Sequence, residues 1–333
     1  MRAPADERVE QPEPATANDA ASAPITVRHR VQHLLLRALV GFLELLPLKL
    51  ALAFASGCGT LLRWILRDRA QLVREQMAAA LGRDAESDEV KADARACFRH
   101  FLRVPVQFLK LPAILKKKTP QQVLVFEDRR VVDDAVAAKR PMIFVTAHLG
   151  NWEIMGGLAP KLGVPIASVG RPVENVLLER EIRRLRERYG QRMIDKGGAG
   201  LPLARVLKQG GAVALLIDQN AGRRGVRVPF FHADASTFTL AAELARRFDA
   251  LFIPVFTRVV GPTEVRGWFE PPIAPDPSLP PDEDAWRMTL LFHRKLEDAI
   301  RAAPGQYFWL HRRWKPGGRE PDPAWREKYA RTR

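Results

Sequence analysis

Short apolar segments alternate with helical segments over the middle of the chain, and this alternation limits the fold more than any other feature. The apolar segments are rich in β-branched residues and bounded by Gly or Pro, which is typical of buried strands. They cover residues 141–147, 165–170, 212–218 and 251–260. Apolar residues at helical spacing fill residues 152–162, 174–190, 199–211, 236–249 and 284–302. We therefore predict an α/β fold with a mainly parallel central sheet flanked by helices.

The first part of the chain is different in character. Residues 1–24 are polar, acidic and rich in Ala and Pro, which is typical of a disordered tail and unlike a cleavable signal peptide. Residues 31–66 are strongly apolar, but their longest charge-free piece covers only residues 50–62, whereas a membrane-spanning helix needs roughly 20 apolar residues. This favours one or two helices lying in a membrane interface. A span in which Arg37 and Lys49 snorkel, and core helices of a soluble domain, are the alternatives.

Helical spacing continues over residues 67–118 and leads into the first predicted strand. The patterns together predict three parts. They are a disordered tail at 1–24, an N-terminal helical, membrane-associated region at 25–120, and an α/β domain at 121–333.

The charge balance is strongly basic, with 53 Lys and Arg against 38 Asp and Glu, a net charge of +15. The excess predicts anionic partners such as lipid headgroups, nucleic acid or an acidic protein. Nucleic acid is the weakest of these, because the arginines of residues 174–190 alternate with glutamates, as on a solvated helix surface, and no nucleic-acid module is present. Cys58 and Cys97 form no disulfide framework, which fits a reducing compartment.

His148 follows the first strong strand directly, at the end where α/β sheets place ligand sites. Gly150 and Asn151 then supply a turn and a helix N-cap, so Glu153 falls in the first helical turn. With this bend between them, the carboxylate of Glu153 can fold back onto the imidazole of His148. Such a pair suits general-base catalysis, in which the carboxylate fixes the tautomer and stabilises the imidazolium. Asn151 and Glu153 also suit any helix N-terminus, so the pair alone leaves both interpretations open.

Two more polar clusters follow later strands. Arg171 comes after the strand at 165–170, and Asp218, Gln219 and Asn220 come after the strand at 212–218. Because carboxyl ends of parallel strands share one edge, these clusters are expected to converge with His148, and Arg171 or Arg223 could bind a phosphate or a carboxylate. Each cluster could also be ordinary turn chemistry. The seven histidines are scattered without a metal-binding spacing, so no metal site is expected.

The same residues carry a resemblance to a known family. The segments "TAHLGNWE", "GRP", "IDQNAGRRGVRVPFFHADASTFTLAAELARRFDALFIPV" and "PGQYFWLHRRWK" occur in order and with fitting spacing, and the apolar N-terminal segment fits as well. Over residues 31–315 the chain resembles the bacterial lipid A biosynthesis acyltransferases, the lauroyl and myristoyl transferases of the lysophospholipid acyltransferase superfamily. The resemblance implies a glycerophosphate-acyltransferase-like fold with N-terminal membrane-associated helices.

The resemblance also implies an activity. It is that of an enzyme at the cytoplasmic face of the bacterial inner membrane, which moves a fatty acyl chain from acyl carrier protein to a hydroxyl of a lipid A precursor without a metal or bound cofactor. His148 would be the general base and Glu153 its partner. The substrate-binding candidates are Asn151, Arg171, Asp218 and Arg223. Relatives of the family acylate other lipids, such as phosphatidylinositol mannosides or amino-acid lipids, and these acceptors and a non-catalytic membrane-surface protein are the alternatives.

Overall fold

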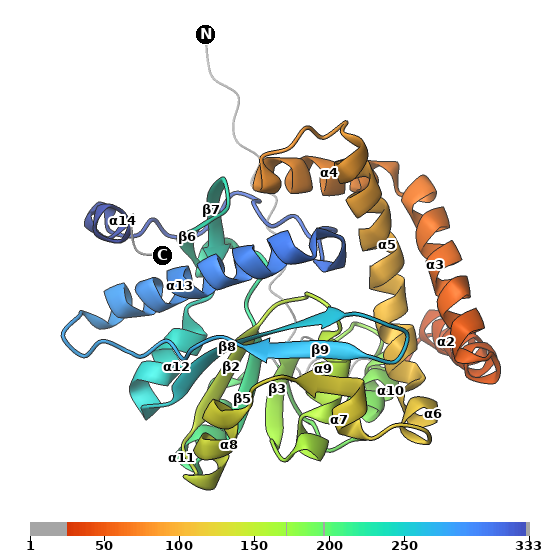
Figure 1. The fold of residues 1–333 in the computed structure, drawn as a ribbon, viewed down its shortest axis with the longest axis horizontal. Coiled ribbons are helices and arrows are strands. Elements are labelled where there is room, and N and C mark those ends of the chain that lie inside the picture. Colours follow the sequence, from red (N-terminus) through yellow and green to blue (C-terminus); the bar gives the residue numbers. More distant parts are fainter. Residues whose placement is uncertain (1–24, 171, 196, 331–333) are drawn as a thin grey trace.

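The computed structural model describes residues 25–330 except residues 171 and 196 (Figure 1). The predicted tail at 1–24 and the candidate Arg171 therefore lie outside the described residues. The elements form one large sheet with helices on both faces and a group of helices at one side of it.

The central sheet has the strand order β1-β9-β8-β2-β5-β3-β4. Its parallel centre consists of the four predicted strands. They are β2 (Met142–Thr146), β3 (Ile166–Gly170), β5 (Ala212–Leu216) and β8 (Leu251–Val259). Strands β8, β2, β5 and β3 run parallel, while β9 pairs with β8 in the antiparallel sense. The prediction of a mainly parallel α/β sheet is confirmed.

Five strands were not predicted, and all are short or carry polar residues. They are β1 (Leu124–Phe126), β4 (Arg192–Asp195), β9 (Val265–Phe269) and the separate hairpin of β6 (Val226–Phe230) and β7 (Ala233–Thr237). Strands β1 and β4 are the two edges of the sheet. Edge strands are less buried, so they can be short and carry polar residues. The helix predicted from residue 236 begins only at Leu240, because Ser236 and Thr237 pair with β6 instead.

The side chains of β2 alternate between two cores, as the two-residue period of a strand requires. Ile143 and Val145 face a large core shared with the helix at 281–302, whereas Met142 and Phe144 face a smaller core beneath the helix at 130–137. The helices that follow the first strand are α8 (Arg130–Ala137), α9 (Trp152–Leu158), α10 (Val176–Glu187), α11 (Gly200–Lys208), α12 (Leu240–Phe248), α13 (Pro281–Ala302) and α14 (Pro323–Tyr329). Burial on both faces explains why the central strands are continuous apolar runs.

The N-terminal helices stack outward from the sheet, with α5 between α3 and the sheet (Figure 1). They are α2 (Val27–Leu45), α3 (Leu48–Ile65), α4 (Arg67–Leu81), α5 (Asp88–Leu109), α6 (Leu111–Leu115) and α7 (Pro120–Val123). Helix α3 packs closely on α5 at Gly59, where an added Cβ would lie 2.6 Å from the Phe98 carbonyl oxygen. Residues of α4 and α5 belong to the same core as the sheet. The division of the chain near residue 120 stays a prediction.

Within the described residues, α3 is the one helix long and apolar enough to cross a membrane by length and composition alone, with a mean hydropathy of 1.3. Only 22% of this helix segment is buried. Membrane association of this region stays a prediction at this stage.

The segment after α13 returns across the carboxyl edge of the sheet and is anchored by a buried arginine. The guanidinium of Arg313 donates to the Ser236 carbonyl oxygen at 2.7 Å, to Thr237 Oγ1 at 2.6 Å and to His293 Nε2 at 3.2 Å. His293 is fully buried, and its Nδ1 donates to the Pro229 carbonyl oxygen at 2.9 Å. Burial, reinforced by the charge of Arg313, lowers the pKa of His293 to about 3.

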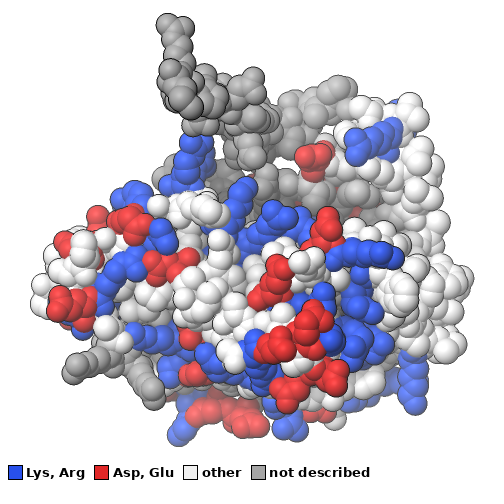
Figure 2. All heavy atoms as spheres, turned by 90° about the horizontal axis from the view of Figure 1, so that it is seen from above, with Lys and Arg blue, Asp and Glu red and all other residues white. Residues whose placement is uncertain are grey.

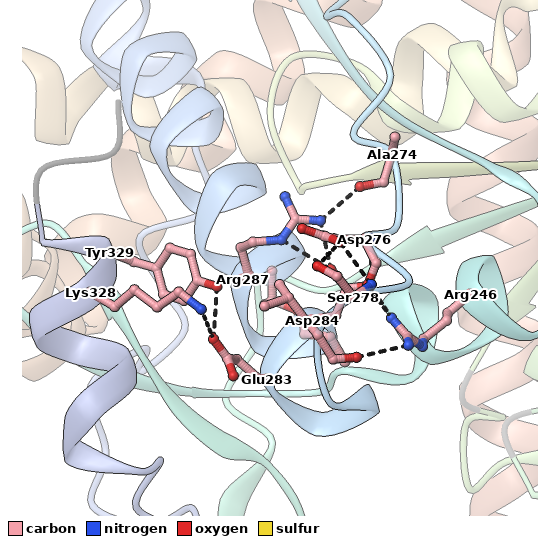
Figure 3. A network of polar contacts seen from close by, with 12 residues as sticks. Arg246, Ala274, Asp276, Ser278, Glu283, Asp284, Arg287, Lys328 and Tyr329 are labelled. Carbon is pink, nitrogen blue, oxygen red and sulfur yellow. Dashed lines mark hydrogen bonds and ion pairs between the residues drawn. The ribbon is translucent and has the colours of Figure 1, made fainter.

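A buried ion-pair network ties the start of α13 to its surroundings (Figure 3). Asp284 is completely buried, and its carboxylate accepts hydrogen bonds from Arg246 at 2.9 Å and from Arg287 at 2.6 Å. It also accepts from the backbone N–H of Asp276 at 3.0 Å. Glu283, one residue earlier, accepts from Lys328 and so holds α14 against α13. The network joins α12, α13 and the preceding loop around one carboxylate.

We predict that stability falls in mild acid and that His293 causes part of the fall. Unfolded His293 takes up a proton below its ordinary pKa of 6.5, whereas the folded group does so only near 3. Its contribution is therefore complete above pH 6.5 and is lost as the pH falls, at up to about 1.4 kcal/mol per pH unit. Urea unfolding of the wild type and of His293→Gln between pH 7.5 and pH 5 measures this. Parallel stability curves for the two proteins would contradict the assignment.

The network predicts a large cost for Asp284→Ala. This change leaves two partly buried arginines facing each other without their carboxylate, which costs about 3–5 kcal/mol for a buried pair. Asp284→Asn keeps one acceptor oxygen and should cost clearly less. Unfolding free energies of both variants test the order, and a loss below about 1 kcal/mol for Asp284→Ala would show that the network is not stabilising.

Candidate active site

A tight turn after β2 carries His148 and fixes its backbone. Gly150 has φ +63°, and an added Cβ there would lie only 2.1 Å from the Thr257 carbonyl oxygen of β8, so the turn requires glycine. Thr257 Oγ1 donates to the Leu149 carbonyl oxygen at 3.0 Å, and His100 Nε2 donates to that of Gly150 at 2.8 Å. The turn is therefore held from β8 on one side and from α5 on the other.

His148 and Asp218 are brought together by the pairing of β2 with β5. The register places Thr146 opposite Leu216, so the residues two positions further along each strand also lie opposite each other. His148 Nδ1 lies 2.8 Å from one carboxylate oxygen of Asp218, and the His148 backbone N–H donates to the other at 3.0 Å. Because a carboxylate only accepts, Nδ1 carries the proton and Nε2 is the nitrogen free to accept one. The predicted convergence of these two strand ends is confirmed.

The environment keeps Asp218 ionised. The side chain is 2% exposed, and burial alone would raise the pKa of its carboxyl group. The contacts with His148 and the charge of Arg313 outweigh burial, so this pKa lies below its ordinary value of 3.8. The imidazole of His148 is 21% exposed, so it bridges a buried charge and the surface. This arrangement stabilises a proton on the imidazole when the ring accepts one.

Glu153 does not contact His148, and the predicted pairing of these two residues is wrong. Its carboxylate accepts two hydrogen bonds from Arg186 of α10, at 2.9 and 2.5 Å. A planar guanidinium matches a carboxylate with two parallel bonds, which an imidazole cannot do. Glu153 therefore joins α9 to α10, and the carboxylate at the imidazole comes from Asp218 instead.

The remaining sequence candidates divide between structure and surface. Asn151 is the predicted N-cap, since its Oδ1 accepts from the Ile154 N–H at 3.0 Å. Its side chain is fully buried and donates to Gln107 Oε1 at 3.0 Å, so Asn151 supports the turn, and a contact with substrate stays a prediction. Arg223 lies exposed on the 3₁₀ turn Gly222–Arg224, beyond Asp218. Arg171, as stated, lies outside the described residues.

Aromatic side chains border the imidazole, and sequence reasoning assigned them no role. The ring centroid of His148 lies 4.9 Å from that of Trp152 and 5.7 Å from that of Phe308. Phe308 in turn stacks on Phe101 of α5 at 4.7 Å. The Phe308 backbone N–H donates to the His148 carbonyl oxygen at 3.0 Å, so the C-terminal segment closes over the turn. The signal was present in "PGQYFWLHRRWK", but only the fold places this segment beside residue 148.

The contact between His148 and Asp218 suits proton transfer, because a polarised imidazole whose Nε2 is free can remove a proton from a hydroxyl group. Over the described residues, no group of three or more His, Cys, Asp and Glu side chains could hold a metal ion.

Comparison with known proteins supports one family. The sequence model of the family described as "Bacterial lipid A biosynthesis acyltransferase" matches residues 25–316. The chain is 31% identical to the lipid A biosynthesis lauroyltransferase of Escherichia coli K12, over 55% of this chain and 59% of that protein. It is 25% identical to a lipid A biosynthesis acyltransferase of Haemophilus influenzae, over 60% and 61%.

A third relative, the E. coli K12 lipid A biosynthesis palmitoleoyltransferase, is 28% identical over 53% of this chain and 56% of its own length. The matched region thus spans between about half and two thirds of these curated relatives. The family match is broader, since it includes the N-terminal helices, the sheet and the C-terminal segment around His148. On this match the chain belongs to the bacterial lipid A biosynthesis acyltransferase family.

Proposed function

We propose that the chain is a membrane-associated O-acyltransferase, which moves a fatty acyl chain from a thioester on acyl carrier protein to a hydroxyl of a lipid A precursor. The observation that carries the proposal is the bond between His148 Nδ1 and buried Asp218, which leaves Nε2 free at a partly exposed ring. Family membership supplies the reaction class, because the relatives are named as lipid A acyltransferases.

In the proposed reaction, Nε2 of His148 removes the proton from the acceptor hydroxyl while its oxygen attacks the thioester carbonyl carbon. The tetrahedral intermediate collapses with cleavage of the carbon–sulfur bond, and the leaving thiolate takes the proton back from the imidazolium. An ester and a free thiol result, and the imidazole is neutral again. Asp218 acts throughout by orienting the ring and stabilising its charged form. No metal or bound cofactor takes part in this sequence.

His148 and Asp218 together are called the dyad. Substrate contacts in this proposal come from the basic side chains near the dyad. Arg223 lies on the turn that follows β5, and Arg171 follows β3 in the sequence; both are proposed to contact phosphate groups of the acceptor. The net charge of +15 favours an acidic carrier protein as donor. Glu153 is proposed to act indirectly, because its ion pair with Arg186 fixes the start of α9 and with it Trp152.

The membrane part of the proposal rests on uncovered apolar side chains of α2 and α3. Leu34, Leu35, Leu61, Trp64 and Ile65 are each 60% or more exposed. Figure 2 shows a mainly uncharged surface at the right, the side on which Figure 1 places α3. Contiguous exposed apolar surface of this kind marks an interaction site. The proposed location is the cytoplasmic face of the bacterial inner membrane, where the acceptor hydroxyl would be supplied from the lipid phase.

We predict that His148→Ala lowers the rate of acyl transfer by at least about 100-fold, the lower range for loss of a general base. The assay follows a labelled acyl chain from acyl carrier protein to a lipid A precursor. His232→Ala is the matched control, because His232 is exposed at the tip of the β6–β7 hairpin. A folded His148→Ala protein with full activity would sink the mechanism.

Paired neutral substitutions distinguish the two carboxylates. Asp218→Asn removes the charge behind the imidazole and should lower kcat by at least about 100-fold with little change in KM. Glu153→Gln removes only a partly exposed ion pair and should cost less than about fivefold. The same transfer assay, with saturation curves for both substrates, measures the two losses. A loss for Glu153→Gln as large as that for Asp218→Asn would contradict this division of roles between the two carboxylates.

A further inference from the structure

A basic cleft lies near the amino ends of β3 and β4, whereas His148 follows the carboxyl end of β2. Its volume is about 600 Å³, within the range of ligand sites. Three consecutive lysines, Lys116, Lys117 and Lys118, line it from the turn between α6 and α7. Lys161, Arg188 and Tyr189 also line it, and the remaining lining residues, Leu115, Thr119, Pro120 and Gln122, carry no charge. Neither the family motifs nor the proposed mechanism uses this cluster.

The positive charge of the cleft is not neutralised within the described part of the chain. None of the four lysines, nor Arg188, makes an ion pair there, whereas nearby Arg183 and Arg186 of α10 are bound to Asp195 and Glu153. The buried hydroxyl of Tyr189 also has no hydrogen-bond partner among the described residues. A buried polar group without a partner is costly, and so is a group of like charges in a concave site. Both features fit a site for an anion.

Apolar side chains of the α2–α3 hairpin lie next to this cleft. Lys110, immediately before α6, donates through Nζ to the carbonyl oxygens of Glu44 and Leu46, at 2.8 and 2.5 Å, and so joins α6 to the hairpin tip. Leu48 of α3 belongs to the same core cluster as Leu115 and Tyr189, which line the cleft. The contacts therefore place the cleft at the tip of the hairpin.

The hairpin tip carries exposed apolar residues, which we name the apolar ridge. Its members are Phe42 at 45% exposure, Leu45 at 86%, Leu50 at 56% and Phe54 at 41%. The rings of Phe42 and Phe54 meet edge to face at 5.3 Å, so the two helices present one continuous surface. An apolar surface beside unpaired cations is typical of proteins that lie on anionic bilayers.

We propose that the cleft binds the phosphate-bearing headgroups of anionic phospholipids while the apolar ridge enters the outer part of the acyl region. The proposal rests on the membrane association in the proposed function, and it adds the lipid class and the residues that select it. Lysines are suited to this task, since each is a flexible point charge that can contact a phosphate of any orientation.

An acidic carrier protein is the competing occupant, and the topology argues against it. Lys161 precedes β3, and Arg188 precedes β4, so the cleft lies at the amino ends of strands whose carboxyl ends face the dyad. A five-residue strand is about 17 Å long. A carrier protein seated in the cleft would hold its thioester across the sheet from His148, whereas a bilayer that contacts the cleft can extend along α2 and α3.

The test is partitioning of the purified full chain onto vesicles of phosphatidylcholine alone and of phosphatidylcholine with phosphatidylglycerol. The variant is K116Q/K117Q, and the matched control is R205Q/K208Q, which removes two exposed charges from α11. We expect K116Q/K117Q to bind anionic vesicles about 30-fold more weakly and the control to stay within about twofold, since a basic residue at the surface contributes about fivefold. Binding to neutral vesicles should be the same for all three proteins.

Several results would overturn the proposal. These are equal losses in K116Q/K117Q and the control, equal losses on neutral and anionic vesicles, or wild-type protein that does not distinguish the two vesicles. Release of the wild type by millimolar inorganic phosphate at constant ionic strength would identify a free-phosphate site instead. Loss of carrier-protein binding in K116Q/K117Q with vesicle binding intact would assign the cleft to that partner.

One further variant separates this proposal from the proposed chemistry. His148→Ala should bind anionic vesicles like the wild type, because His148 lies at the carboxyl ends of the strands and the cleft lies at their amino ends. Failure of the acyl-transfer mechanism would leave that result unchanged, and failure of the lipid proposal would leave the His148 activity result unchanged. A thermal unfolding midpoint for each variant confirms that it is folded.

Discussion

The parallel pairing of β2 with β5 is the constraint on which the candidate site depends. Backbone hydrogen bonds set the register that places Thr146 opposite Leu216, and the chain beyond each strand then delivers His148 and Asp218 to the same point. One carboxylate accepts from both the ring and the backbone of His148, so the ring cannot rotate without losing a bond to a buried charge. The register of two apolar strands thus fixes a polar contact to within hydrogen-bond distance.

A buried carboxylate needs compensation, and the C-terminal segment supplies it. Arg313 lowers the pKa of Asp218 through its charge, and it is itself held by carbonyl oxygens of the β6–β7 hairpin and of the chain after β5. Neutral His293 accepts from the same guanidinium. Since Asn220 also donates to the carbonyl oxygens of Arg313 and Lys315, an amide rather than a carboxylate suits that position. The β6–β7 hairpin, α13 and the segment that follows α13 therefore support the dyad.

The sequence contained enough to predict the sheet and the location of the site, but not the identity of the pair. The buried central strands are continuous apolar runs, and His148 and Asp218 both follow such runs, so their common edge could be predicted. Their direct contact depends on strand order and register, which no local pattern encodes. Glu153 was the nearer carboxylate along the chain. In the structure, however, it pairs with Arg186, which lies 33 residues away in sequence. The edge strands were missed because β1 is three residues long and β4 begins and ends with charged residues.

Helix α5 connects the proposed membrane face with the dyad, and its position bears on how a lipid hydroxyl reaches His148. One side of α5 receives Gly59 of α3, while the other side contributes His100 to the turn and Phe101 to the stack on Phe308. The thickness separating the apolar helices from the turn that carries His148 is therefore that of one helix, about 10 Å. An acceptor anchored in a bilayer along α2 and α3 would need to lift its hydroxyl by only this distance. The basic cleft would hold the far end of the same face on anionic headgroups, so two separated contacts would fix the tilt of the protein and keep the dyad at a constant height above the lipid.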